Sequence, residues 1–170
     1  MRKPISPWRA RVFSPGRRAA GCVLAGVALL TAATLGAPPA SAMYMGNYAL
    51  HIPDRRDFHT WIWSANAPCR LADNTKRTDC LRVITIPQPI AKAIYSNVEA
   101  TLNDGRYTMV IDDPFGLRCG DIYYGPTIPT HDVYTWDATT LTGELVSSFG
   151  AGCDGAPGGQ RVYPFSLTRM

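Results

Sequence analysis

From residue 43 onward, apolar and polar residues alternate along much of the chain with a period of two. In the stretch 97–103, for example, Val98, Ala100 and Leu102 fall on one face and polar residues fall on the other. Alternation of this kind is typical of half-buried β-strands, whereas an amphipathic helix repeats about every 3.6 residues. The pattern predicts eight strands, at residues 48–52, 59–65, 81–87, 97–103, 106–112, 131–137, 141–149 and 162–170.

Short connections between these stretches indicate how the strands are arranged. Asn103-Asp104-Gly105 separates two alternating stretches, and glycine accepts the positive φ that a tight hairpin turn requires. Residues 137–140 are expected to join the next two strands. Sequential antiparallel strands usually lie side by side, and a meander of this size can close and remove its edges. We therefore expect an all-β domain of eight antiparallel strands in a meander, in which a small closed barrel is favoured over a two-sheet sandwich.

Prolines mark the places where the alternation stops. Residues 87–96 are expected to hold a short helical turn that begins at a proline. Pro164 lacks the N–H that a strand donates to its neighbour, so the last strand is expected to begin near it or to lie at an edge. Pro114 and Pro129 stiffen residues 113–130, which we interpret as one long loop.

Residues 1–42 have the organisation of a secretory signal peptide. Basic residues come first, an apolar run without acidic residues follows over 22–35, and the small residues GAPPASA precede a predicted cleavage after Ala42. The apolar run is shorter than the ~20 residues that a transmembrane helix needs. We therefore expect a single exported β-domain, residues 43–170, that is secreted or lies in the cell envelope and has no membrane span after cleavage.

Removal of this segment changes the net charge of the protein. Six of the 17 Lys and Arg residues lie in 1–42, and all 13 Asp and Glu residues lie in 43–170, whose net charge is therefore −2. The exported domain also has no run of basic residues. Nucleic-acid binding depends on a basic surface, so we do not expect a nucleic-acid partner.

The exported domain has four cysteines, Cys69, Cys80, Cys119 and Cys153. An even number of cysteines in an exported domain indicates disulfide bonds, and four cysteines allow three pairings. We favour Cys69–Cys80 and Cys119–Cys153, because Cys69 and Cys80 flank a short polar loop between two apolar stretches. This pairing is also consistent with an eight-stranded meander, in which each pair would lie at one end of the barrel. A structural zinc site usually needs closely spaced CxxC pairs, which this sequence lacks, so neither a metal nor a cofactor is predicted.

The sequence contains no recognisable catalytic motif. The GxSxG motif of serine hydrolases is absent, and Ser147-Ser148 lies within a predicted strand. Adjacent carboxylates at a strand end, such as Asp112 and Asp113, are more often turn formers than a catalytic pair. A small envelope hydrolase that uses Asp112, Asp113 or His131 is therefore the alternative to a binding protein and not the favoured function.

The domain has more large aromatic residues than alternating strands require. The predicted 113–130 loop carries a Tyr-Tyr pair, and loops of this length often bind or contact other molecules. We expect one of these tyrosines to be buried under the loop and the other to be exposed. The partner is predicted to be a small apolar ligand or an envelope or host protein. The candidate ligand or contact surface comprises Tyr123, Tyr124, Trp61, Trp63 and Trp136.

Several motifs occur together in the exported domain: WIWS at 61–64, IPQPIAKA at 86–93, LNDGRYT at 102–108, the stretch from Leu117 to Gly143, and CDGAPGG at 153–159. In this combination the sequence resembles a family of small exported proteins of mycobacteria and related actinobacteria. The resemblance implies an extracytoplasmic location and a kind of source organism, but it assigns no catalytic residue. The function favoured by the sequence is that of a secreted or envelope-associated, non-enzymatic binding protein.

Overall fold

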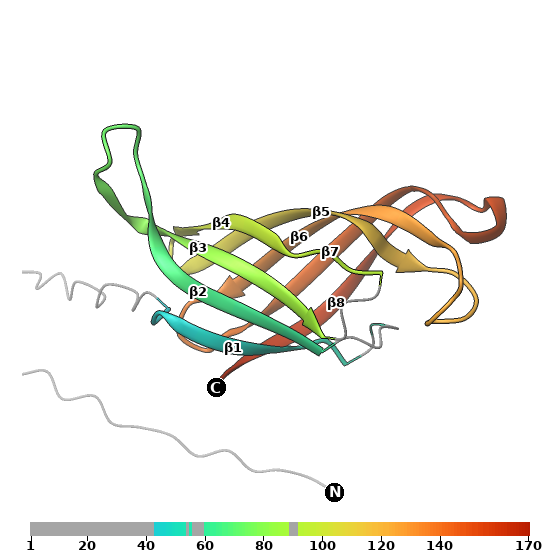
Figure 1. Cartoon of the computed structure of the whole chain (residues 1–170), viewed down its shortest axis with the longest axis horizontal. Coiled ribbons are helices and arrows are strands. Elements are labelled where there is room, and N and C mark those ends of the chain that lie inside the picture. Colours follow the sequence, from blue (N-terminus) through green and yellow to red (C-terminus); the bar gives the residue numbers. More distant parts are fainter. Residues whose placement is uncertain (1–42, 54, 56–59, 89–91) are drawn as a thin grey trace, which may run out of the picture. The chain divides into compact units, whose positions relative to one another are not determined.

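The computed structural model describes residues 43–53, 55, 60–88 and 92–170, so the predicted signal peptide lies outside the described residues. A single turn of 3₁₀ helix, η1 (Cys153–Gly155), accompanies the strands. The described residues contain no helix with the length and apolar character needed to span a membrane. Eight strands make up most of the described chain (Figure 1): β1 Gly46–His51, β2 Thr60–Arg70, β3 Lys76–Gln88, β4 Ser96–Asn103, β5 Arg106–Arg118, β6 Thr127–Asp137, β7 Thr142–Ala151 and β8 Pro157–Arg169.

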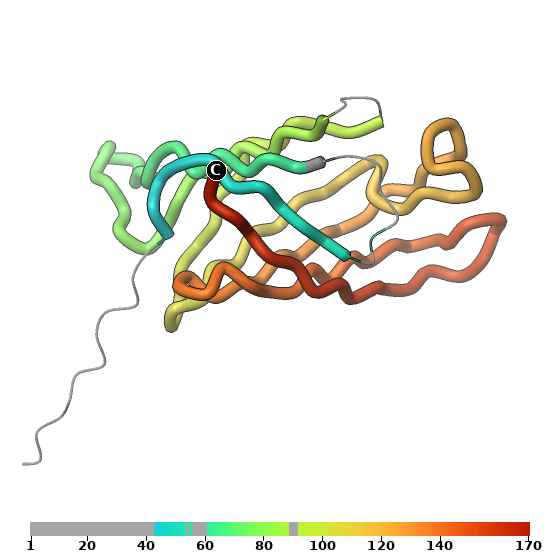
Figure 2. Tube along the Cα trace, turned by 90° about the horizontal axis from the view of Figure 1, so that it is seen from below, coloured from blue at the N-terminus to red at the C-terminus, as the bar shows by residue number. Residues whose placement is uncertain are grey.

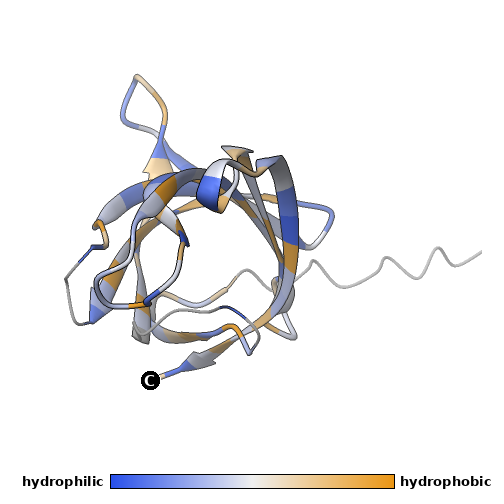
Figure 3. Cartoon of the chain, turned by 90° about the vertical axis from the view of Figure 1, so that its right-hand side faces the viewer, coloured by the Kyte–Doolittle hydropathy of each residue, from blue (hydrophilic) through white to orange (hydrophobic). Residues whose placement is uncertain are grey.

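The strands form a closed antiparallel barrel. Each strand pairs with the next along the chain, and β1 also pairs with β8, where Leu50 lies opposite Leu167. Figure 3 looks along the barrel and shows the ring of strands end on. The structure therefore confirms the predicted eight-stranded meander, and the strands close into a barrel instead of separating into two sheets.

The two ends of the barrel differ. We call the end that holds the β1–β2, β3–β4, β5–β6 and β7–β8 connections the mouth, and the opposite end the base. Figure 2 shows the β5–β6 and β7–β8 hairpins extending beyond the other strands at the mouth. The disulfide Cys119–Cys153 joins these two hairpins, and Cys69–Cys80 joins β2 to β3 near the base. Both predicted disulfide pairings are confirmed.

Tight turns at the base have the predicted positions. Asp104 and Gly105 connect β4 to β5, and both have positive φ, 47° and 77°, as in a primed hairpin turn. In the β6–β7 connection, the Asp137 carboxylate accepts hydrogen bonds from the N–H groups of Thr139 at 2.9 Å and Thr140 at 2.8 Å. Side-chain acceptors of this kind satisfy turn N–H groups that have no partner in the sheet. The turn therefore extends through Leu141, and β7 begins at Thr142, one residue later than predicted.

Large aromatic side chains fill the middle of the barrel. Trp63 lies at the centre of this cluster, with ring-centroid distances of 5.1 Å to Tyr134 and 5.4 Å to Trp136. Phe165 lies 5.7 Å from the rings of both Trp63 and Tyr134, and Tyr107 stacks on Trp136 at 5.2 Å. Such aromatic pairs contribute about 0.5–1.5 kcal/mol each beyond the apolar area that they bury. The inward faces of the alternating strands thus form a packed aromatic core.

The predicted long loop over 113–130 is shorter in the structure. β5 continues through a β-bulge, where its pairing with β6 changes register after Asp113, and β6 begins at Thr127. The connecting loop comprises only residues 119–126. Pro114 in β5 and Pro129 in β6 interrupt the alternation of apolar and polar residues. Neither proline can donate a hydrogen bond to a neighbouring strand, and the bulge in β5 accommodates Pro114. The alternation of apolar and polar residues therefore covers only part of β5 and β6, and both strands extend beyond it.

The predictions for Pro164 are partly corrected. β8 begins at Pro157 and not near Pro164, which pairs with Glu144 of β7. Within the described residues, β8 pairs with β1 only from Ser166 onward. Among the described residues, β8 therefore has a single neighbouring strand at Pro164, where the missing N–H costs no ladder hydrogen bond on the other side.

The predicted helical turn over 87–96 is not found in the described residues. β3 continues to Gln88, and residues 92–95 are not helical. Residues 89–91 lie outside the described residues, as does His59 at the start of the second predicted strand.

Candidate functional site

The predicted contact surface is divided between the core and the surface of the barrel. Trp63 and Trp136 have exposed fractions of 1% and 0%, so these two residues belong to the core and not to a contact surface. Their strands place them on the inward face, in line with other buried aromatic residues. Trp61 is only partly buried and lines a small cavity near the mouth.

Tyr123 and Tyr124 are both exposed, with exposed fractions of 52% and 89%. The expectation that one of them is buried under the loop is therefore wrong. Both residues lie in a turn in which the Asp121 carboxylate accepts their backbone N–H groups at 2.8 Å. Their ring centroids lie 6.3 Å apart.

Backbone and side-chain contacts hold this tyrosine loop, residues 119–126, in one conformation. Its ends are joined by a hydrogen bond from the Cys119 N–H to the Pro126 carbonyl at 2.9 Å. Lys92, in the β3–β4 connection, donates to the Gly125 carbonyl at 2.5 Å, and Arg118 donates to the Lys92 carbonyl at 2.7 Å. A Cβ atom at Gly125 would lie 1.9 Å from the Cys119 carbonyl oxygen, so this turn requires glycine.

The residues of the alternative hydrolase lie on opposite faces of the barrel wall. Asp112 and His131 project outward, with 2.7 Å between Oδ1 and Nδ1, whereas the Asp113 side chain is buried inside. Adjacent residues of a strand point to opposite faces, so these three side chains do not converge. An open groove of about 530 Å³ passes Asp112, His131 and Ser148. The Ser148 hydroxyl, however, donates to the backbone carbonyl of His131 at 3.1 Å.

A buried polar cluster lies inside the barrel at the mouth, and sequence reasoning did not identify it as a unit. Arg55 enters from the β1–β2 connection, and the other members point inward from β5, β6 and β7. Among these residues, Thr130, Asp132 and Ser147 are nearly inaccessible to solvent. We call this set the mouth cluster; it comprises Arg55, Asp113, Thr130, Asp132, Tyr134 and Ser147.

The Arg55 guanidinium lies among oxygen atoms from two strands. Its Nη1 donates to the Tyr134 hydroxyl at 3.2 Å, and its Nη2 lies 3.7 Å from Asp132 Oδ2 and 3.8 Å from Asp113 Oδ2. Nη2 also donates to the Gly116 carbonyl at 3.5 Å. A buried charge needs such partners, because desolvation without them would cost several kcal/mol. The cluster therefore places opposite charges together inside the wall of a small barrel.

Neutral groups complete the mouth cluster. The Ser147 hydroxyl donates to Asp132 Oδ1 at 2.6 Å, which is short because the acceptor is a carboxylate. Burial raises the pKa of the Tyr134 hydroxyl well above its ordinary value, and the nearby Arg55 charge opposes this rise only in part. Tyr134 is therefore a neutral phenol at physiological pH. The hydroxyl of Thr130 is buried and has no hydrogen-bond partner in the described part of the chain.

A small cavity adjoins the mouth cluster. It offers about 10 Å³, which is about the space that one water molecule needs. Ligand pockets for small molecules are usually about 300–1,000 Å³. The cavity therefore does not accommodate an apolar ligand of ordinary size. Its walls are formed by Trp61, Trp63, Thr85, Ile94, Ser96, Ile111, Asp113, Asp132 and Tyr134.

The sequence does carry a signal for part of this cluster. Asp132 has the same alternation phase as Tyr134 and Trp136, so this charged residue lies on the same inward face of β6 as the two aromatic residues. Ser147 likewise shares its face with Leu145. Arg55 has no such signal, because it belongs to a connection between strands.

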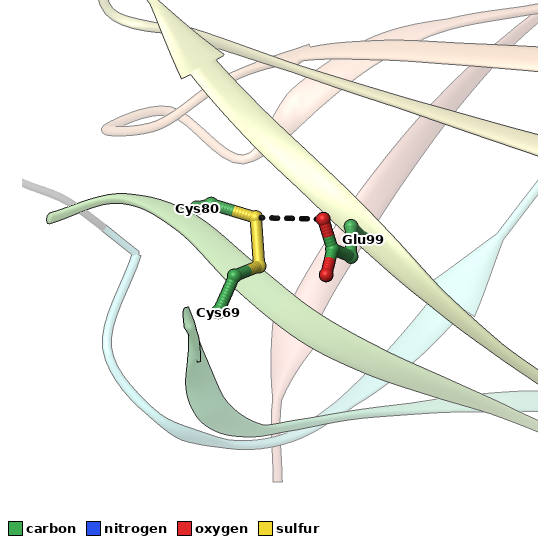
Figure 4. Close-up of side chains that lie close together, drawn as sticks. All are labelled: Cys69, Cys80 and Glu99. Carbon is green, nitrogen blue, oxygen red and sulfur yellow. Dashed lines mark hydrogen bonds between the residues drawn. A yellow bond between two sulfur atoms is a disulfide. The ribbon is translucent and has the colours of Figure 1, made fainter. Parts of the chain in front are cut away.

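Among the described residues, one set of three potential metal-binding side chains lies close together: Cys69, Cys80 and Glu99 (Figure 4). The two sulfur atoms are joined in a disulfide, and the Cys80 Sγ lies 3.8 Å from the Glu99 carboxylate. Sulfur binds metals as a thiolate, which a disulfide does not provide. This set is therefore part of the β2–β3 disulfide and not a metal centre.

Comparisons with known proteins find no matching family model, no matching curated protein and no matching solved structure. Functional inference for this chain therefore starts from its own geometry. Two features stand out in the described part of the chain, the exposed tyrosine loop and the buried mouth cluster.

Proposed function

We propose that this protein is an exported, non-enzymatic binding protein that contacts an envelope protein through Tyr123 and Tyr124. The observation that carries the proposal is the exposure of both side chains on a loop that a disulfide and several hydrogen bonds hold in place. Tyrosine is one of the residue types that contribute most to binding energy at protein interfaces. A loop that is ordered before binding loses little conformational entropy when the complex forms.

The packing of the barrel favours a protein partner over a small apolar ligand. Aromatic rings fill the middle of the barrel, and the cavity at the mouth has space for about one water molecule. Two exposed rings on a protruding hairpin instead offer an amphipathic surface, which suits a pocket or groove on another protein.

An extracytoplasmic location accords with this function. The two disulfides are compatible with an oxidising compartment, where such bonds persist. The signal-peptide pattern of residues 1–42 and the resemblance to exported actinobacterial proteins point to the same location, and both remain predictions.

Binding of the purified domain to envelope fractions of the source organism tests the proposal. Three proteins are compared at equal concentration: the unmodified domain, the double variant Tyr123→Ala/Tyr124→Ala, and the control Tyr44→Ala. Tyr44 is an exposed tyrosine near the base, at the opposite end of the barrel. Because interface hot spots contribute about 2 kcal/mol or more, the double variant is expected to bind at least about tenfold more weakly.

Two results of this experiment contradict the proposal. The first is equal binding by the double variant and the unmodified domain. The second is an equal loss in the Tyr44 control, which would indicate nonspecific adhesion of exposed aromatic residues. Native mass spectrometry of protein purified from its source provides a further check, since a co-purifying small molecule would favour a ligand carrier.

One observation favours the alternative, a small hydrolase. The 2.7 Å contact between Asp112 and His131 resembles the pair that orients a catalytic imidazole, and the pair faces the open groove. A fluorophosphonate probe and a chromogenic ester test this function. Ester hydrolysis that is lost in His131→Ala would establish the hydrolase, whereas the binding function predicts no labelling and no turnover above buffer.

A further inference from the structure

The mouth cluster contains a cationic group that does not come from the barrel wall. Arg55 lies in the connection between β1 and β2, and its side chain is 8% exposed. Among the described residues, the groups that contact the guanidinium are acceptors: two carboxylates, the Tyr134 hydroxyl and the Gly116 carbonyl. The barrel itself thus builds an acceptor-lined pocket, and a connecting segment supplies the group that occupies it.

The contacts of Arg55 Nη2 with Asp113, Asp132 and Gly116 are long for charge-assisted hydrogen bonds. Such bonds usually measure about 2.7–2.9 Å between nitrogen and oxygen. Here the Nη2 atom lies 3.7 Å from Asp132 and 3.8 Å from Asp113, and its bond to Gly116 measures 3.5 Å. The Nη2 atom therefore lies near both carboxylates without a short hydrogen bond to either.

A second, independent observation points to a ligand in the same place. The Thr130 side chain is directed inward beside Asp113, its residue is 4% exposed, and its hydroxyl has no hydrogen-bond partner among the described residues. A buried hydroxyl without a partner costs about 1–3 kcal/mol, which is seldom retained for stability alone. The mouth cluster thus contains a buried polar group that none of the described residues satisfies.

The walls of the adjoining cavity also suit a cation. Trp61 and Trp63 line it together with Asp113 and Asp132. Aromatic faces attract cations through their quadrupole, and a carboxylate supplies the opposite charge. Several acceptors converge from different strands, which matches the planar, five-donor fork of a guanidinium better than the single point charge of an ammonium group.

We infer that the mouth cluster is a binding site for a guanidinium group, and that Arg55 is its intramolecular occupant. A guanidinium-bearing ligand displaces the Arg55 side chain and hydrogen-bonds to Asp113, Asp132 and Thr130. This site is separate from the tyrosine loop, so its failure would leave the proposed contact function intact.

The variant Arg55→Ala tests the inference by removing the occupant from the otherwise complete domain. The probe is methylguanidinium chloride at millimolar concentration, matched in ionic strength with sodium chloride. The variant is expected to show a saturable rise in melting temperature of about 4 °C, because a ligand that binds only the folded state stabilises it. The unmodified domain, whose site is occupied, is expected to need at least tenfold more probe.

Adjacent aspartates provide a matched control. In Arg55→Ala/Asp113→Asn one of the two inward carboxylates is lost, and the response to methylguanidinium is expected to disappear. In Arg55→Ala/Asp112→Asn the altered carboxylate lies on the outer face, and the response is expected to persist. Methylammonium, which has no planar fork, should give at most a tenth of the affinity.

Several outcomes overturn the inference. One is an Arg55→Ala variant that responds no more than the unmodified domain. Another is an equal response in the Asp113→Asn and Asp112→Asn backgrounds. If neither Arg55→Ala nor Arg55→Gln folds alone, folding that is restored by methylguanidinium supports the site, and a continued failure to fold in its presence overturns it.

The source of the guanidinium group is distinguished by a second arm of the same experiment. A short peptide with one central arginine replaces methylguanidinium. Tighter binding of the peptide assigns the site to an arginine side chain of a partner protein, and tighter binding of methylguanidinium assigns it to a small molecule. Failure of both probes to bind Arg55→Ala counts against the site.

Discussion

Ser147 and Asp132 face each other across β7 and β6 inside the barrel, and the serine hydroxyl donates to the carboxylate at 2.6 Å. Both residues are almost completely buried. If the donor is removed, the carboxylate stays buried without this partner and its desolvation is no longer fully compensated. Loss of this hydrogen bond therefore costs more stability than loss of an ordinary surface hydrogen bond. The pair therefore connects two strands of the wall at the same level where Arg55 enters the mouth.

Replacement of this serine is expected to destabilise the domain. Ser147→Ala removes the donor and should lower the free energy of unfolding by about 1.5–3 kcal/mol, as for other hydrogen bonds to charged groups. Ser148→Ala is the matched control, because the next residue lies on the outer face and bonds to a backbone carbonyl. Its effect should stay within about 0.5 kcal/mol. Urea unfolding measures both, and similar losses in the two variants would contradict the prediction.

Removal of the two disulfides is expected to have unequal effects. Cys119 and Cys153 are separated by 34 positions, whereas Cys69 and Cys80 are separated by 11. In the chain-entropy model, the longer loop contributes roughly 4 kcal/mol and the shorter loop roughly 3 kcal/mol. Urea unfolding of the two Cys→Ser double variants should therefore show the larger loss for the 119–153 pair. The reverse order would indicate that folded-state contacts outweigh the loop entropy.

The barrel was predictable from sequence because long stretches of its wall follow one rule. Inward and outward residues alternate along β4 and along β5 as far as Asp113, and the hairpin at Asp104-Gly105 adds a strong turn signal. The strand ends near the mouth were not predictable in the same way. There Pro114 and Pro129 interrupt the alternation, although the bulge and the continuing pairing extend both strands.

The mouth cluster was harder to predict than the wall for two physical reasons. A buried carboxylate such as Asp132 looks like a solvated charge unless its alternation phase is compared with that of its aromatic neighbours. Arg55 comes from a connection, and periodicity says nothing about where a connection folds. Both loop tyrosines likewise lie in a local turn, held by backbone hydrogen bonds to Asp121, that the alternation pattern does not describe.

Truncation of the loop tyrosines should barely change stability. Tyr123→Ala and Tyr124→Ala are each expected to alter the free energy of unfolding by about 0.5 kcal/mol or less, since both side chains are exposed. Tyr107→Ala is the contrasting variant, because this tyrosine is buried against Trp136 and its truncation should cost about 3–5 kcal/mol. Thermal melts with both disulfides intact measure the difference. A large loss at Tyr124 would show that the loop packs on the barrel.

Acid is expected to weaken the β6–β7 turn. Hydrogen bonds from the N–H groups of Thr140 and Thr139 hold the pKa of Asp137 below its ordinary value of 3.8. A carboxyl whose pKa is lower in the folded state stabilises the protein above its unfolded pKa, and this contribution is lost as the pH falls through the folded pKa. The stability difference between the domain and Asp137→Asn should thus be constant near neutral pH and shrink below about pH 4. A difference that is equal at pH 6 and pH 2.5 would contradict this assignment.

The first residues of the predicted exported domain should contribute unequally to its stability. Met43 is 4% exposed and belongs to the core cluster at the base, whereas Met45 is 57% exposed. Truncation of a buried methionine typically costs about 2–5 kcal/mol, so Met43→Ala should lower the free energy of unfolding by at least about 2 kcal/mol. Met45→Ala, two positions away, should change it by about 0.5 kcal/mol or less. Urea unfolding distinguishes the two variants, and equal small effects would show that Met43 does not contribute to the core at the base.

N-terminal sequencing tests the predicted cleavage site. The sequence of the exported protein is expected to begin at Met43, and a mature N-terminus beyond Met43 would show that the predicted site is wrong.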